Sequence, residues 1–268
     1  MIGLFSIMAV GFFLGMRHAT DPDHVIAVST IVSRQPRLSR AALIGAFWGL
    51  GHTVTILVVG TAIILFNVTI PARLGLSMEL SVGFMLIFLG LLNVASFFRS
   101  LPDAPLPANP KNVHHAHPHA HGDYIHSHPH THQPEAHPHT PDQTPVAFLD
   151  RMLGTSNLYQ HVRPLAVGIV HGLAGSAAVA LLVLATIQNT TWAIAYLLVF
   201  GVGTIAGMMV ITMSLASAIK VVGGRSHAVA RRLAMASGML SLAFGFVVVY
   251  QIGFVNGLFT NHPLWTPR

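Results

Sequence analysis

Six long apolar segments restrict the fold of this chain more than any other feature of its sequence. A membrane-spanning helix needs about 20 mainly apolar residues, and a lipid interior admits only helices and closed barrels. The chain has 268 residues, of which 8% are charged, whereas soluble domains have about 25%. We therefore expect an all-α polytopic membrane protein with about six transmembrane helices. The apolar segments are 2–33, 41–66, 79–98, 164–187, 192–219 and 233–257.

Basic residues are divided unequally between the two sides of these segments. When the loops are assigned to alternate sides, Arg73 and Arg268 fall on one side and eleven basic residues on the other. Cytoplasmic loops carry the excess of Lys and Arg. The pattern predicts a multi-pass protein of the inner (cytoplasmic) membrane, with both termini outside and the long central loop in the cytoplasm. The eleven are Arg34, Arg37, Arg40, Arg99, Lys111, Arg151, Arg163, Lys220, Arg225, Arg231 and Arg232.

The two halves of the chain carry related glycine-rich patterns. His18 precedes Gly51 by 33 residues, and His171 precedes Gly203 by 32 residues. Each half then ends in a third apolar segment. Three spans per half place the halves in opposite orientations, an arrangement common in secondary transporters with a site near the membrane midplane. The expected parts are a three-helix membrane half, a cytoplasmic loop and a second three-helix half, at 1–98, 99–163 and 164–268.

Residues 17–24, Arg-His-Ala-Thr-Asp-Pro-Asp-His, place two histidines and two aspartates inside the first apolar segment. Ionisable groups at membrane depth cost roughly 3 kcal/mol each, and imidazole with carboxylate suits a divalent first-row metal. Because Pro22 disfavours a continuous helix, we expect a break at which four candidate metal ligands converge. In the alternative interpretation the motif is a loop between two interfacial helices, with one aspartate as a helix cap. The four candidates are His18, Asp21, Asp23 and His24.

His52 is a further candidate ligand, because it lies well inside the second apolar segment among small residues. Beside the first motif, coordination is favoured over a simple interhelical hydrogen bond. Thr53 is a candidate hydrogen-bonding partner for a metal-bound imidazole, although hydroxyls also bond to helix carbonyls. In the second half, His171 and Ser176 are candidate residues of the ion path. The small residues around them favour helix packing equally well.

Segment 102–145 contains eleven of the eighteen histidines, interspersed with Pro, Ala and Thr. Proline and low complexity oppose a packed core, so the composition predicts a disordered loop. The density of imidazoles indicates accessory metal buffering or sensing, since a flexible segment lacks the geometry that transport requires. A solubilising linker and a pH-sensitive tether are the alternatives.

The motif at 17–24 closely resembles the signature of the nickel/cobalt transporter family, and Leu-Gly-His-Thr at 50–53 is similar to that family's second motif. The resemblance implies that His18, Asp23 and His24 are metal ligands, supported by Asp21 and His52. Family members often have eight spans and a Leu-Gly-Phe-Asp motif in the second half. This chain has about six apolar segments and His-Gly-Leu-Ala-Gly-Ser there, which is more similar to the short branch of urease-associated nickel permeases.

These features together predict a permease with Ni²⁺ or Co²⁺ as transported substrate and no prosthetic group. Uptake is the favoured direction and efflux the alternative, because a cytoplasmic histidine-rich loop suits both. A membrane metalloenzyme is a more distant alternative, since a zinc hydrolase would need an open coordination position and a base. A storage or sensing scaffold would depend on 102–145. We expect a transporter and not an enzyme. Its expected partners are divalent metal ions, the lipid bilayer and cytoplasmic metallochaperones, without nucleic acid.

Overall fold

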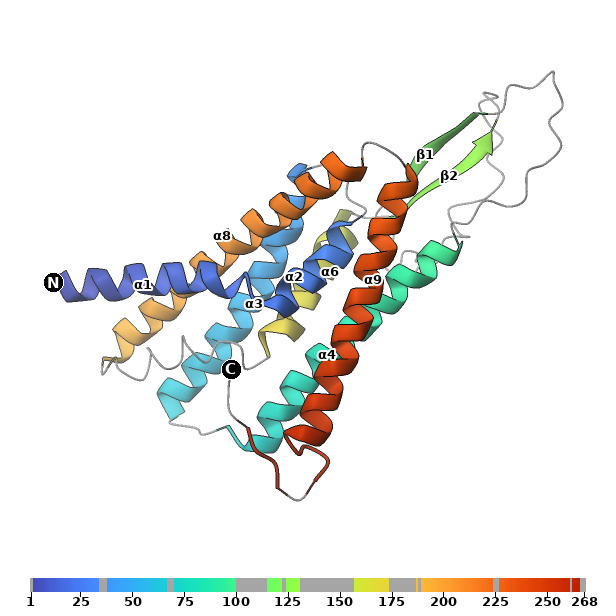
Figure 1. The fold of residues 1–268 in the computed structure, drawn as a ribbon. Helices are drawn as coiled ribbons and strands as arrows, with labels where there is room; N and C mark the ends of the chain where they lie inside the picture. The colour runs from blue at the N-terminus through green and yellow to red at the C-terminus, as the bar shows by residue number, and fades with distance from the viewer. Residues whose placement is uncertain are drawn as a thin grey trace.

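Apolar helices make up most of the part of the chain that the computed structural model describes (Figure 1). The prediction of a helical membrane protein is therefore confirmed. The described residues are 2–33, 38–66, 70–99, 115–121, 124–130, 157–173, 187, 189–223, 227–260 and 262–265. The helices are α1 (Ile2–His18), α2 (Pro22–Val32), α3 (Leu38–Phe66), α4 (Ala72–Arg99), α6 (Asn157–Gly172), α8 (Thr190–Gly223), α9 (His227–Tyr250) and the π-helical η3 (Gln251–Val255).

Among the described residues, four helices are long and apolar enough to cross a membrane, and α1 and α2 are shorter apolar helices. Large apolar side chains remain exposed on their outer surfaces, for example Phe13 at 66% and Phe84 at 55%. An apolar surface of this extent suits contact with lipid rather than water. The four candidate spans are Leu38–Phe66, Ala72–Ala95, Thr190–Val222 and Arg232–Val255.

Several helices begin earlier than their apolar segments predict, and α4 and α6 show the largest differences. α4 starts at Ala72 instead of residue 79, and α6 starts at Asn157 instead of residue 164. Hydropathy marks only the part of a helix that suits hydrocarbon, whereas backbone hydrogen bonding continues into the more polar flanks. α6 ends at Gly172, and the rest of the predicted fourth span, 174–186, lies outside the described residues.

The first apolar segment is broken where the sequence predicts. α1 ends at His18 and α2 begins at Pro22, whose missing amide hydrogen suits the first turn of a helix. Asp21 occupies the position before α2, yet the structure describes no hydrogen bond from its side chain to the first amides of that helix. Its Oδ2 lies instead 2.9 Å from Nδ1 of His18. The carboxylate therefore faces the histidine, not the end of the helix.

Glycines allow α1 and α8, which lie side by side in Figure 1, to approach closely. A Cβ at Gly15 would collide with the carbonyl oxygen of Phe200, and one at Gly203 would collide with that of Phe12. Small residues at such contacts let two backbones pack directly in a membrane, where packing rather than the hydrophobic effect holds helices together. This contact joins the two halves of the chain.

A matching pair of glycines joins α3 and α6. A Cβ at Gly168 would collide with the carbonyl oxygen of Trp48, and one at Gly51 would collide with that of Leu165. α3 also packs along α8, and α4 packs along α9. Each half thus contributes one helix to each of these interfaces, and the break between α1 and α2 is held close to the end of α6.

Two short strands lie within the histidine-rich segment. β1 (His115–His121) pairs with β2 (Tyr124–His130) in antiparallel register, so that residue 115 is opposite residue 130. These strands differ from the disorder predicted for this part of the loop, because the alternation of histidine with other residues also fits the two-residue period of a strand. The rest of 102–145 lies outside the described residues.

Candidate metal centre

Four buried imidazoles meet at the break between α1 and α2. His18 is the last residue of α1, and His24 lies in the first turn of α2. His52 comes from the middle of α3, and His171 from the last turn of α6. His18 is 6% exposed and the other three are fully buried. Since buried polar groups need partners, this concentration of imidazoles requires an explanation beyond packing.

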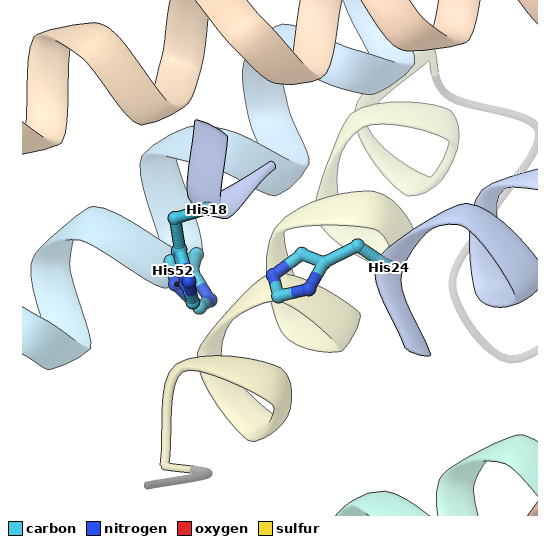
Figure 2. Close-up of side chains that lie close together, drawn as sticks. All are labelled: His18, His24 and His52. Atoms are coloured by element: carbon cyan, nitrogen blue, oxygen red, sulfur yellow. Dashed lines mark hydrogen bonds between the residues drawn. The ribbon is translucent and has the colours of Figure 1, made fainter. Parts of the chain in front are cut away.

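The first group of candidate ligands consists of His18, His24 and His52, each with a potential ligand atom within 4.8 Å of the others. Nε2 of His18 lies 2.8 Å from Nε2 of His52. The ring of His24 points towards this pair (Figure 2), and its centroid lies 4.8 Å from that of His18 and 5.1 Å from that of His52. The fold thus brings together the three histidines that the sequence predicts as metal ligands.

The spacing of this first group suits one metal ion. Two nitrogens bound at about 2.0–2.1 Å to one ion lie roughly 2.9–3.4 Å apart at ordinary coordination angles. The 2.8 Å between His18 and His52 is close to this range. Nε2 of His24 is buried and has no hydrogen-bond partner among the described residues. An unpartnered buried polar atom costs about 1–3 kcal/mol, and a divalent cation bound between the three rings would remove that cost.

The two aspartates contact the outer edges of the imidazoles. Oδ2 of Asp21 lies 2.9 Å from Nδ1 of His18, and Oδ1 of Asp23 lies 3.1 Å from Nδ1 of His24. A metal-bound histidine usually donates its other ring N–H to a carboxylate, which fixes the ring's tautomer and orientation. The sequence predicts both aspartates as metal ligands. In the structure, each aspartate is instead positioned to orient an imidazole of the first group, Asp21 the ring of His18 and Asp23 the ring of His24.

A second group of candidate ligands consists of Asp23, His24 and His171. Nε2 of His171 lies 3.0 Å from Oδ2 of Asp23. The ring centroids of His24 and His171 are 4.1 Å apart. The sequence predicts His171 only as a residue of the ion path, but the structure brings it into direct contact with the aspartate of the first motif.

Aromatic side chains close the site on two sides. The Trp48 ring stacks on that of His24 with centroids 6.5 Å apart, and it lies 5.6 Å from the His171 ring. The Phe200 ring lies 5.7 Å from that of His18. Neither Trp48 nor Phe200 is among the candidate residues that the sequence predicts. Trp48 lies four residues before His52, a spacing that puts both on one face of α3 and was the available local signal.

Thr53 and Ser176 are the remaining two candidate residues. The Thr53 hydroxyl donates a 3.2 Å hydrogen bond to the carbonyl oxygen of Gly201, so it joins α3 to α8 rather than contacting an imidazole. Ser176 lies outside the described residues. Hydroxyl-to-carbonyl bonds of this kind are the alternative that the sequence left open for Thr53.

The fold and the site define a class: a polytopic helical membrane protein with a buried histidine–aspartate cluster of metal-binding geometry. No family model matches the chain, and no solved structure matches it. The urease accessory protein UreH of Bacillus sp. (strain TB-90) is 34% identical over 259 residues, which cover 96% of each chain. The chain therefore belongs to the UreH family, and this confirms its resemblance to the short, urease-associated branch of nickel/cobalt transporters. The relative is an accessory protein of an enzyme, in agreement with the expectation of a non-enzymatic role.

Proposed function

We propose that this chain is a permease that carries Ni²⁺ across the cytoplasmic membrane into the cell. The observation that supports this function best is the group His18, His24 and His52, buried among helices long and apolar enough to cross a membrane. Ionisable side chains at membrane depth usually serve an ion path. Co²⁺ suits the same ligands, but the urease-associated permeases that the motifs resemble carry nickel.

The proposed substrate site has three parts with different tasks. The nitrogens of His18, His24 and His52 replace water on the entering ion. Asp21 and Asp23 accept hydrogen bonds from the outer ring nitrogens and offset the charge of the cation. The aromatic rings beside the imidazoles exclude competing water. Binding is thus strong enough to strip water from the ion, and a change in the arrangement of the helices releases it.

The packing of the two halves supports an inverted repeat. Residues of α1 can be matched with the residues of α6 that follow them by 153 positions, and residues of α3 with the residues of α8 that follow them by 152 positions. With this matching, the contacts between α1 and α8 correspond to the contacts between α6 and α3. Gly15 then corresponds to Gly168, and Gly51 to Gly203. Transporters built this way expose a central site to each side in turn by rocking one half against the other, and we propose the same motion here.

The distribution of basic residues supports an orientation with both termini outside and the histidine-rich loop in the cytoplasm. In that position the loop receives ions that leave the membrane site, buffers them and passes them to cytoplasmic metallochaperones. Efflux is the competing direction, because the same loop would also collect surplus metal for export.

The test is accumulation of radioactive Ni²⁺ over time in cells that express the wild type, His18→Ala, or a deletion of 102–145. Cells with empty vector are the reference. We expect accumulation above the vector level in the wild type, a return to that level in His18→Ala, and transport with altered apparent affinity in the deletion. Accumulation below the vector level, reversed by His18→Ala, would replace uptake by efflux. Loss of function in the deletion alone would favour a storage or sensing scaffold.

A further inference from the structure

His24 belongs to both groups of candidate ligands in the described part of the chain. Its two ring nitrogens have different neighbours. Nδ1 lies 3.1 Å from Oδ1 of Asp23, whereas Nε2 has no hydrogen-bond partner among the described residues. In Figure 2 the ring extends from its backbone towards His18 and His52. One imidazole is therefore positioned to serve two adjacent sets of ligands.

The second set has the features of a metal position in its own right. Its neighbouring ligand atoms are spaced like those of the first group, with Oδ2 of Asp23 3.0 Å from Nε2 of His171 and Oδ1 3.1 Å from Nδ1 of His24. His171 is fully buried, and its Nδ1 has no hydrogen-bond partner among the described residues. One carboxylate with two imidazoles suits a divalent first-row cation.

His171 has the same place in the second half that His18 has in the first. The ring of His18 lies 5.7 Å from that of Phe200 in α8, and the ring of His171 lies 5.6 Å from that of Trp48 in α3. Phe200 and Trp48 occupy corresponding positions, each three residues before the glycine that contacts the other half. The two groups thus contain one equivalent histidine from each half.

We propose that the transported divalent cation occupies two adjacent positions in turn. His18, His24 and His52 form one position, and Asp23, His24 and His171 form the other. This inference rests on the proposed function. The cation exchanges His18 and His52 for Asp23 and His171. His24 binds it through Nε2 in the first position and through Nδ1 in the second. As the ion moves, Nδ1 gives up its proton and the freed Nε2 takes one up, so the ring stays neutral and contacts the ion in both positions.

Trp48 provides a local reporter of the bound ion. Its indole lies beside the rings of both His24 and His171. Ni²⁺ has a partly filled d shell and quenches the emission of a nearby indole. Subtracting a titration of Trp48→Phe removes the emission of the other two tryptophans and the effect of ions bound to the histidine-rich loop. The full-length protein in detergent is titrated with Ni²⁺, and the same variants are assayed for uptake into sealed vesicles.

Binding and transport should separate in these variants. His18→Ala and His171→Ala each leave one position, so Trp48 quenching should persist with an apparent affinity within about tenfold of the wild type. Uptake should fall at least about tenfold in both, because the ion has lost its second position. His24→Ala should weaken quenching by about 100-fold or more, since both positions lose a ligand. His24→Asn keeps a polar side chain at this position and should weaken quenching as much as His24→Ala does.

His171→Gln separates a ligand from a hydrogen-bonding residue. Its amide can still donate to Asp23 but provides no imidazole nitrogen, so we expect the same loss of uptake as in His171→Ala. Normal uptake in His171→Gln would overturn the second position. Loss of quenching in His171→Ala as complete as in His24→Ala would also overturn it, because a single composite site would explain that result. A wild type that quenches as expected but moves no Ni²⁺ would contradict the permease, whereas the binding pattern would still support two positions.

Discussion

His52→Ala should lower the initial rate of Ni²⁺ uptake at least about tenfold, because a three-nitrogen position loses one ligand. The substitution also leaves Nε2 of His18 without the nitrogen that lies 2.8 Å away. A buried polar atom without its partner costs about 1–3 kcal/mol, so the protein should be destabilised but remain folded. The measurement is the initial rate in sealed vesicles, normalised to the amount of folded protein.

Leu50→Ala is the matched control for His52→Ala. Leu50 precedes His52 by two residues on the same helix, and its side chain is 43% exposed on the outer surface. It should change uptake less than about twofold, since an exposed substitution away from the site has little effect. His52→Gln keeps a polar side chain of similar length and should not restore transport. A His52→Gln variant with the wild-type rate would show that His52 is a packing residue, contrary to the proposal.

Gly168→Val should prevent stable folding of the membrane core. A Cβ at this position already collides with the carbonyl oxygen of Trp48. Because the obstacle is backbone, no side-chain rotation can relieve the overlap, and α6 must move away from α3. Overpacking of this kind costs about 3 kcal/mol or more. The yield of monodisperse protein in detergent and the midpoint of thermal unfolding, followed by circular dichroism, measure the effect.

Ala166→Val adds bulk to the same helix on a face that is exposed in this structure. It should leave the unfolding midpoint close to that of the wild type, because residue 166 is exposed among the described residues and has room for the added methyl groups. Gly15→Val, at the corresponding contact of α1 with the carbonyl of Phe200, should be as damaging as Gly168→Val. If Gly168→Val were as stable as Ala166→Val, the close contact between α3 and α6 would be wrong.

Local sequence signals were sufficient to predict the break in the first segment and to single out the three candidate ligands of the first group. Pro22 cannot continue a helix from the preceding turn, so the position of the break follows from covalent geometry alone. His18 and His24 flank that break, and His52 lies deep in an apolar segment that must still pack against it. The structure brings the three together, with 2.8 Å between Nε2 of His18 and Nε2 of His52 and 4.8 Å between the ring centroids of His18 and His24.

Local signals did not predict the tasks of the other polar residues. Spacing along the chain could not show that Asp21 faces His18 instead of the amides of α2, because both partners are within reach of one short side chain. Nor could it show that the Thr53 hydroxyl bonds to Gly201, which lies 148 residues away. For both residues, the partner that the side chain contacts depends on which helix packs beside it.

The sequence by itself determined that the chain is a helical membrane protein, where its first helix breaks and which histidines border the break. These properties depend on hydrocarbon thickness and backbone geometry, which act over one or two turns or one span. Only the tertiary structure decided that His171 contacts Asp23 and that Trp48 stacks on His24. Those contacts need α3 and α6 to pack backbone against backbone, and that packing depends on glycines from both halves of the chain meeting at one interface.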